Sequence, residues 1–261
     1  IFLDLLGVGI VIPILPAVLL DPMGGVLPLL TAYTTRTIVF GFLVASYPLA
    51  QFFSAPILGA LADQKGRKKI LVISLMGTFL GYLIFAIGIL RKDINLLFLG
   101  RIIDGLTGGN IAIAQSTIAD ISDEKNKAKN FGFIGMAFGL GFILGPYIGG
   151  KLSDPSLVSW FTYATPFYLA MILSLLNILL VILRFPETLA VKKQIKISLL
   201  TGVRNLKKAF TKKELKVMFL VGFLLAIGFN FFTQFFQVLL IGKFKFTQSN
   251  IGDFFAYMGL W

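Results

Sequence analysis

The chain of 261 residues contains no cysteine and no histidine. Disulfide bonds, thiol nucleophiles and histidine-based metal sites are therefore excluded, and so are imidazole proton relays. Acidic residues are also few, at 12 against 24 lysines and arginines. An enzyme would have to work with scattered carboxylates and hydroxyls alone, so we expect no enzyme, no metal and no cofactor. Any proton chemistry in an apolar segment depends on carboxylates.

Long polar stretches are nearly absent. Hydrophobic residues make up 57% of the chain, and the mean hydropathy is +0.88. A soluble domain of this size could not cover so much apolar surface. Apolar runs of about 20 residues recur, each long enough to cross a hydrocarbon core of about 30 Å. The sequence therefore predicts an all-α membrane protein.

Seven apolar spans and the start of an eighth can be counted. Their approximate limits are 1–20, 37–60, 70–90, 96–118, 131–150, 162–184 and 217–240, and then 251 onward. The chain opens inside an apolar segment without methionine and closes about ten residues into another. We therefore expect a fragment of a longer protein.

Positive charge is concentrated in alternate loops. Of the 24 basic residues, 17 fall within 65–69, 125–129 and 184–216. The positive-inside rule then predicts that the loops 61–69, 119–130 and 185–216 are cytoplasmic, in a multi-pass protein of the cell inner (plasma) membrane. Anionic lipid headgroups, and not nucleic acid, are the expected partner of this charge.

The one long polar segment, 185–216, divides the chain. Apolar residues recur at helical spacing from Leu199 to Phe210, opposite lysines and arginines, which predicts an amphipathic helix on the cytoplasmic membrane surface. We expect a six-helix bundle over 1–184, a basic linker over 185–216 and the start of a second bundle over 217–261. A regulatory or partner-binding helix is the alternative for the linker.

A charged turn lies between the second and third spans and has the pattern G-x3-D-x2-G-R-[KR]-[KR]. Its residues are Gly59, Asp63, Gly66, Arg67, Lys68 and Lys69. This pattern resembles the loop between helices 2 and 3 of the major facilitator superfamily of transporters, although Gln64 and Lys65 depart from the residues usual there. The resemblance implies a conformational switch, in which Asp63 pairs with a neighbouring helix end. The basic residues of this turn also act as an anchor that sets the orientation of the spans in the membrane, and this interpretation holds alongside the first.

Asp4 stands in the string DLLGVGIVIPILP of the first span. An ionised carboxylate within a span costs several kcal/mol, so it pairs with a cation or takes up a proton, as a proton carrier does. An interfacial position at the true start of the helix is the alternative. The string resembles the first helix of the drug:proton antiporters, in which this Asp lies well inside the membrane.

The fourth span carries Arg101 and Asp104, one helical turn apart, where Asp104 is a possible local partner of the arginine. At about 100° per residue, one face of this span combines polar and small residues. These are Arg101, Gly105, Gly108, Ala112 and Gln115. The R-x3-G element is similar to that of helix 4 in the family, implicated in proton coupling, although Asp104 replaces the usual Gln. Arg101 would then exchange between Asp4 and Asp104; a static buried ion pair is the alternative.

The fifth and seventh spans complete the pattern. The fifth contains Gly132, Gly141, Gly145, Pro146, Gly149 and Gly150, whose spacing matches the antiporter motif of the superfamily. Such glycines let a neighbouring helix pack backbone to backbone, and Pro146 removes a hydrogen bond. In the seventh span, Asn230, Gln234 and Gln237 follow i, i+4, i+7 spacing. Together with Gln115 they either line a substrate path or hydrogen-bond neighbouring helices.

Four motifs in order identify the chain as a member of the major facilitator superfamily, of the drug:proton antiporter type that includes tetracycline and multidrug exporters. The resemblance implies twelve helices in two bundles, of which this chain holds the N-terminal six and the start of the second. It also implies export of a small lipophilic molecule against protons, by alternating access, in a protein we expect to be monomeric. The alternatives are an uptake symporter for a sugar or small metabolite, and a receptor or scaffold of the same fold.

Overall fold

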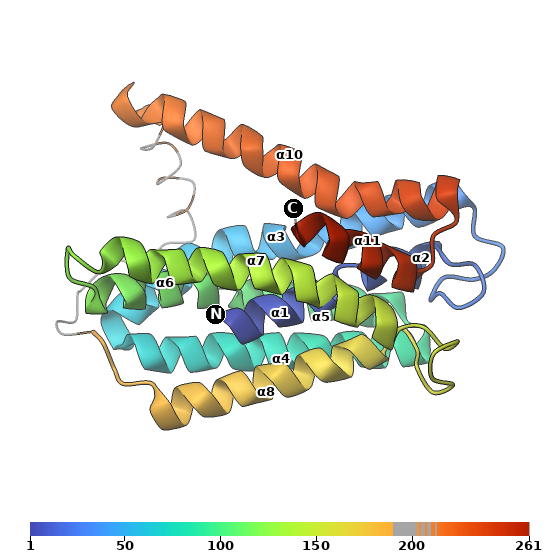
Figure 1. Cartoon of the computed structure of the whole chain (residues 1–261), viewed down its shortest axis with the longest axis horizontal. Helices are drawn as coiled ribbons and strands as arrows, with labels where there is room; N and C mark the ends of the chain where they lie inside the picture. Colours follow the sequence, from blue (N-terminus) through green and yellow to red (C-terminus); the bar gives the residue numbers. More distant parts are fainter. Residues whose placement is uncertain (190–201, 203, 205–206, 208–209, 212, 261) are drawn as a thin grey trace.

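The computed structural model describes residues 1–189, 202, 204, 207, 210–211 and 213–260, and this part is helical, without strands (Figure 1). The helices are α1 (Phe2–Val11), α2 (Ile14–Leu20), α3 (Tyr33–Lys65), α4 (Arg67–Arg91), α5 (Ile94–Thr107), α6 (Asn110–Ile121), α7 (Lys127–Leu152), α8 (Thr165–Arg184), α10 (Lys213–Phe244) and α11 (Gln248–Leu260). Seven stretches of the described residues are long and apolar enough to cross a membrane. The predicted all-α membrane fold is confirmed.

Two of the predicted spans each consist of two helices separated by a break. The first consists of α1 and α2, which meet at Ile12 and Pro13. The fourth consists of α5 and α6, which are separated by Gly108 and Gly109. Proline has no N–H to donate, and consecutive glycines weaken a helix, so both breaks have a local cause. Broken helices persist in membranes only where neighbouring groups satisfy the freed backbone.

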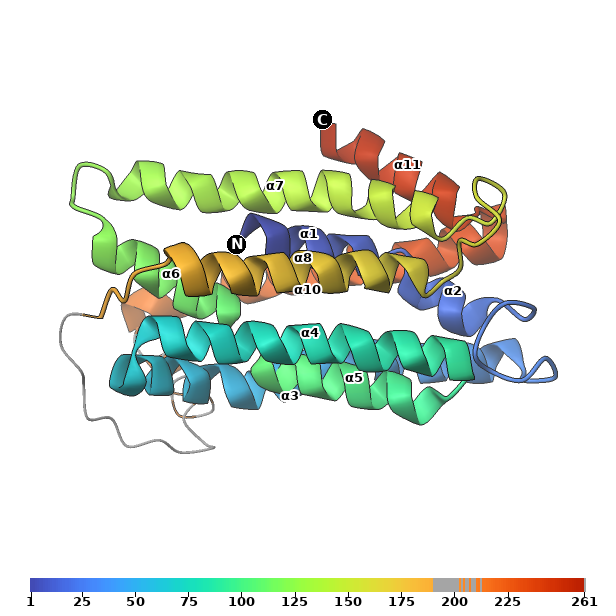
Figure 2. The same cartoon turned by 90° about the horizontal axis from the view of Figure 1, so that it is seen from below.

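The helices lie lengthwise beside one another (Figures 1 and 2). α4 packs against α5 and α8, α3 packs against α5, and α1 packs against α7. Residues of α1 and α2 such as Ile10, Ile14 and Leu15 are buried in the centre. The α3–α4 turn, the α6–α7 loop and the C-terminus of α8 share the left end of the molecule in Figure 1. The loops 61–69 and 119–130 and the start of the segment 185–216 thus meet at one end, which we call the basic end.

α10 contacts the rest of the molecule mainly with its C-terminal part. Its residues from 216 to 232 are exposed, whereas Gln237 and Leu240 are buried. Figure 1 shows the same separation, because α10 draws away from α7 toward the basic end. α11 packs along α7. The amphipathic helix predicted from Leu199 to Phe210 falls mostly outside the described residues.

Arg36, in the first turn of α3, organises the end of the molecule opposite the basic end. Arg36 is 2% exposed, and its guanidinium donates to five backbone carbonyls of the described residues. The acceptors are Leu19 (3.0 Å), Asp21 (3.3 Å), Leu27 (3.4 Å), Pro28 (2.6 Å) and Thr31 (3.1 Å). A guanidinium offers five donors, and the C-terminus of α2 carries partial negative charge. One side chain thereby ties α2, the loop 21–32 and α3 together.

We predict that Arg36→Met lowers the free energy of unfolding by at least about 2 kcal/mol, because several buried carbonyls lose their donor. Thermal unfolding of the purified protein in detergent measures the effect. Arg91→Met, at the exposed end of α4, removes the same charge and should leave the midpoint unchanged. An unchanged midpoint in Arg36→Met would show that water replaces the guanidinium.

Candidate functional site

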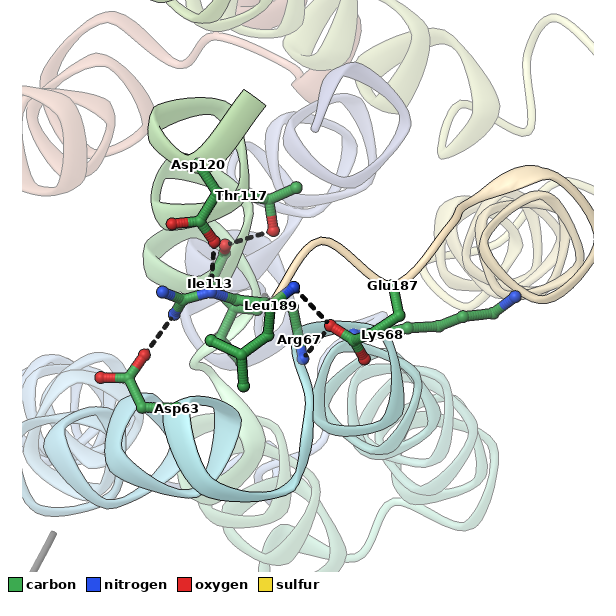
Figure 3. Close-up of polar contacts among 8 residues, drawn as sticks. All are labelled: Asp63, Arg67, Lys68, Ile113, Thr117, Asp120, Glu187 and Leu189. Atoms are coloured by element: carbon green, nitrogen blue, oxygen red, sulfur yellow. Dashed lines mark hydrogen bonds and ion pairs between the residues drawn. The ribbon is translucent and has the colours of Figure 1, made fainter. Parts of the chain in front are cut away.

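The α3–α4 turn forms an ion-pair cluster at the basic end. Arg67 Nη1 lies 2.8 Å from Asp63 Oδ1, and Arg67 Nε lies 2.9 Å from Asp120 Oδ2 (Figure 3). The arginine is 8% exposed, and each carboxylate side chain is about a quarter exposed. Asp63 lies in the last turn of α3, and Asp120 lies in the last turn of α6. Arg67 therefore holds three helices at one point.

Glu187, just after α8, caps the N-terminus of α4. Its carboxylate accepts from the backbone N–H of Arg67 (2.9 Å), Lys68 (3.3 Å) and Leu189 (3.0 Å) (Figure 3). Burial acts to raise the pKa of Glu187, but hydrogen bonds from the backbone N–H groups outweigh it and hold the pKa below its ordinary value. Lys68 Nζ donates to the carbonyl of Ile182 at 2.8 Å. The turn is thus joined to α8 as well.

The predicted switch residues occupy distinct places in this turn. Gly66 has a φ of 110°, which favours glycine, and the Glu187 carboxylate lies where a Cβ would stand. A Cβ at Gly59 would meet nothing within 4 Å among the described residues. Asp63 contacts Arg67, one turn away. Sequence reasoning did not single out Glu187, which lies 120 positions from Arg67 in the chain.

The break between α5 and α6 is satisfied by side chains of α3 and α4. Gln51 donates to the carbonyl of Gly108 at 2.6 Å, and Ser54 donates to that of Gly105 at 2.9 Å. Ser74 donates to the carbonyl of Thr107 and accepts from the N–H of Gly109 at 3.2 Å. The break is therefore built into the packing.

This break presents Asn110 to Asp4. Asn110 Nδ2 donates to Asp4 Oδ2 at 2.7 Å, across 106 positions of sequence. Asp4 is 8% exposed and Asn110 is 7% exposed. Sequence reasoning missed Asn110; the signal available was the Gly108-Gly109 pair just before it. Asp4 is a buried carboxylate with a neutral hydrogen-bond partner.

Arg101 and Asp104 point to different neighbours. The guanidinium carbon of Arg101 lies 4.7 Å from the ring centroid of Tyr47 on α3. Its Nε is buried and has no hydrogen-bond partner in the part of the chain that the structure describes. Asp104 is 6% exposed, and its Cβ lies against Gly81 on α4. Arg101 forms no ion pair with any described residue. The local pair considered from the sequence is not formed in this conformation, because the guanidinium of Arg101 lies on the ring of Tyr47 instead.

The glycines of α7 pack against two helices. A Cβ at Gly145 would lie 2.6 Å from Cα of Gly9, and one at Gly141 would lie 3.0 Å from Cβ of Leu5. Gly149 rests on the backbone of Ile10, and Gly150 on that of Gln248 in α11. Gly132 has no such neighbour within 4 Å among the described residues. α7 therefore touches α1 and α11 backbone to backbone, with Pro146 inside a continuous helix.

At the end opposite the basic end, α7 and α11 are joined by an ion pair. Lys151 Nζ lies 2.8 Å from Asp253 Oδ2 and donates to Ser249 Oγ at 2.8 Å. This contact joins the six-helix part of the chain to its last described helix. At this end α7 and α11 are in contact, whereas the N-terminal part of α10, at the basic end, is exposed.

The polar residues of α10 lie beside an aromatic cavity of about 570 Å³. Its lining from α7, α10 and α11 includes five phenylalanines, together with Asn230 and Thr233, and no charged residue. Gln234 and Gln237 each have a buried side-chain oxygen without a partner. Gln115 is exposed on α6, beyond the helix break, so the face expected to run from Arg101 to Gln115 is interrupted.

Comparisons with known proteins agree on one family. The family model of the Major Facilitator Superfamily matches residues 1–261. The tetracycline resistance protein, class H, of Pasteurella multocida is 37% identical over 186 residues, which are 71% of this chain and 42% of that protein. The quinolone resistance protein NorA of Staphylococcus aureus is 32% identical over 256 residues, 96% of this chain and 59% of that protein. The chain thus spans about half the length of these relatives.

Solved structures give the same fold. The crystal structure of the human organic anion transporter MFSD10 (TETRAN) matches with a TM-score of 0.72 at 25% identity, covering 99% of this chain and 67% of that one. The D-xylose-proton symporter matches with a TM-score of 0.65 at 17% identity, covering 99% of this chain and 64% of that one. At that identity the second likeness concerns the fold alone.

Proposed function

Because the chain belongs to the major facilitator superfamily, we propose that this membrane transporter exports drugs or other small lipophilic molecules in exchange for protons. Relatives named for tetracycline and quinolone resistance support export of an aromatic drug. The antiporter-type glycines of α7, packed on α1 and α11, support exchange over uptake. The substrate and its coupling to protons are our proposal for the whole protein.

One observation carries the proposal: two buried carboxylates, Asp4 and Asp104, lie in the bundle with an arginine that pairs with neither. A buried carboxylate without a cation is most stable when protonated. Arg101, held over Tyr47, is available to pair once a proton leaves. Release of a proton would therefore let Arg101 form an ion pair with Asp4 or Asp104, and uptake of a proton would break that pair. The attraction between the helices would thus depend on the proton, which is what coupling of transport to protons requires.

The aromatic cavity supports a lipophilic substrate. It is large enough for a drug-sized molecule, and its phenylalanines favour a planar aromatic ring. Asn230 and Thr233 supply the few polar groups that orient such a ligand. The buried side-chain oxygens of Gln234 and Gln237, on the same helix, would accept hydrogen bonds from a substrate that moves along α10.

We assign the structure to the state open toward the cytoplasm. The lysines and arginines of the basic end support its cytoplasmic placement, and with it that of the loops 61–69, 119–130 and 185–216. The Lys151–Asp253 pair would then close the outer side. In the outward-open state, residues 1–184 and 217–261 would move against each other, with 185–216 as the linker.

The test uses the full-length protein in energised inside-out membrane vesicles, with a fluorescent reporter of luminal pH. Addition of a tetracycline or a quinolone should release luminal protons, because each drug molecule enters in exchange for protons. Vesicles without the protein are the control. No release with any drug, together with proton-coupled uptake of a sugar in right-side-out vesicles, would replace the exporter with an uptake symporter.

A further inference from the structure

Tyr82, on α4, carries a hydroxyl that has no hydrogen-bond partner among the described residues. The residue is 4% exposed, and its Oη is buried. An unsatisfied hydroxyl in the interior costs free energy, and phenylalanine would fill the same space without that cost. A tyrosine at this position therefore points to a partner that is gained in another conformation.

The hydroxyl lies against α1, which carries Asp4, and its own helix α4 packs on α5, which carries Asp104. It is 3.3 Å from the position that a Cβ on Gly7 would take, one turn after Asp4 on α1. On the other side, a Cβ at the adjacent Gly81 would lie 2.7 Å from Cβ of Asp104 on α5. The ring packs edge-on against Phe167 of α8, with centroids 6.3 Å apart. Tyr82 thus lies against α1 and α8, while the neighbouring Gly81 brings α4 against α5 at Asp104.

The charged and titratable groups around this hydroxyl are those of the candidate proton site. Electrostatic interactions link it to Asp104 and Arg101 on α5, to Asp4 on α1 and to Tyr47 on α3. α8 contributes the apolar Phe167 and Ala170 at this point. A hydroxyl among two carboxylates and a cation can donate to whichever carboxylate is ionised.

We infer that Tyr82 is a positioning residue of the proton site, whose hydroxyl donates a hydrogen bond to Asp4 or Asp104 after that carboxylate has released its proton. The inference rests on the proposed proton-coupled export. The hydrogen bond stabilises the ionised carboxylate and so favours proton release. In the present conformation the Tyr82 hydroxyl has no hydrogen-bond partner among the described residues. The hydrogen bond to the carboxylate forms when α1 or α5 shifts against α4.

The test is Tyr82→Phe in the full-length protein, reconstituted in liposomes. Drug uptake driven by a proton gradient should fall about tenfold, and its pH profile should move about one unit to higher pH, because a carboxylate that loses a donor to its ionised form has a higher pKa. Drug exchange without a gradient and the thermal unfolding midpoint should stay at wild-type values, since no existing contact is lost.

Tyr168→Phe is the matched control, because Tyr168 lies on α8 and is 40% exposed. An unchanged pH profile in Tyr82→Phe overturns the inference. A lower unfolding midpoint or lost exchange also overturns it, because the hydroxyl would then be structural. Failure of the wild-type protein to couple drug to protons in the same liposomes is a separate result, which overturns the proposed export itself.

Discussion

Replacement of Asp4 by asparagine is expected to abolish drug transport driven by a proton gradient, by at least about 100-fold, the lower end of what loss of a proton-transfer group costs. An amide cannot take up and release a proton near neutral pH. The amide can still exchange a hydrogen bond with Asn110, which now bonds Asp4 at 2.7 Å, so the fold should persist. Gradient-driven uptake in inside-out vesicles measures the loss.

Two further readouts separate coupling from folding in this variant. Exchange of labelled drug across liposomes without a gradient should continue, because the aromatic cavity proposed for the substrate is lined by α7, α10 and α11 and does not include Asp4. Asp154→Asn, in the loop between α7 and α8, removes a carboxylate outside the membrane spans and should transport normally. Full gradient-driven uptake by Asp4→Asn would end the role of Asp4 as the proton carrier.

Replacement of Arg67 by alanine is expected to disable the switch at the basic end. Two carboxylates, Asp63 and Asp120, then face each other without the cation that now lies within 2.9 Å of both. Removing one partner of a fully buried pair costs about 3 to 5 kcal/mol, and the partial exposure here reduces this to about 1 to 3 kcal/mol. We expect transport to fall about tenfold or more, together with a lower thermal unfolding midpoint.

The double variant Arg67→Ala/Asp120→Asn distinguishes charge repulsion from loss of packing. It removes one of the two opposing carboxylates, so the midpoint should recover in part. Lys69→Ala is the matched control, since Lys69 lies on the same turn, is exposed and carries the same charge. If Arg67→Ala transports and unfolds like Lys69→Ala, the cluster only sets topology, as a basic anchor would.

Three glycines singled out from the sequence lie where the structure has a close backbone approach or a special backbone conformation. Gly145 and Gly149 meet α1, and Gly66 has the positive φ that its turn requires. These contacts follow from the absence of a side chain, which the sequence shows directly. The partner helices could be named only through the resemblance to a family, because a glycine face by itself specifies no neighbour.

Polar partners distant in sequence could not be predicted. Asn110 bonds Asp4 from 106 positions away, and Glu187 caps α4 from 120 positions away. Arg36 was not singled out from the sequence, yet it is buried and donates to five carbonyls between Leu19 and Thr31. Each case depends on where a loop or a helix break brings its residues, and such breaks have only weak local signals.

The sequence by itself determined that this protein crosses a membrane, how many spans the described chain contains, and where its basic loops lie. These properties are local, because the length of an apolar run and the charge beside it decide how a segment inserts. Only the tertiary structure decided that Arg101 lies on Tyr47, that Asp4 bonds Asn110 and that Tyr82 lacks a partner. A polar side chain in an apolar bundle takes the partner that packing brings within hydrogen-bond range, and packing joins residues from every part of the chain.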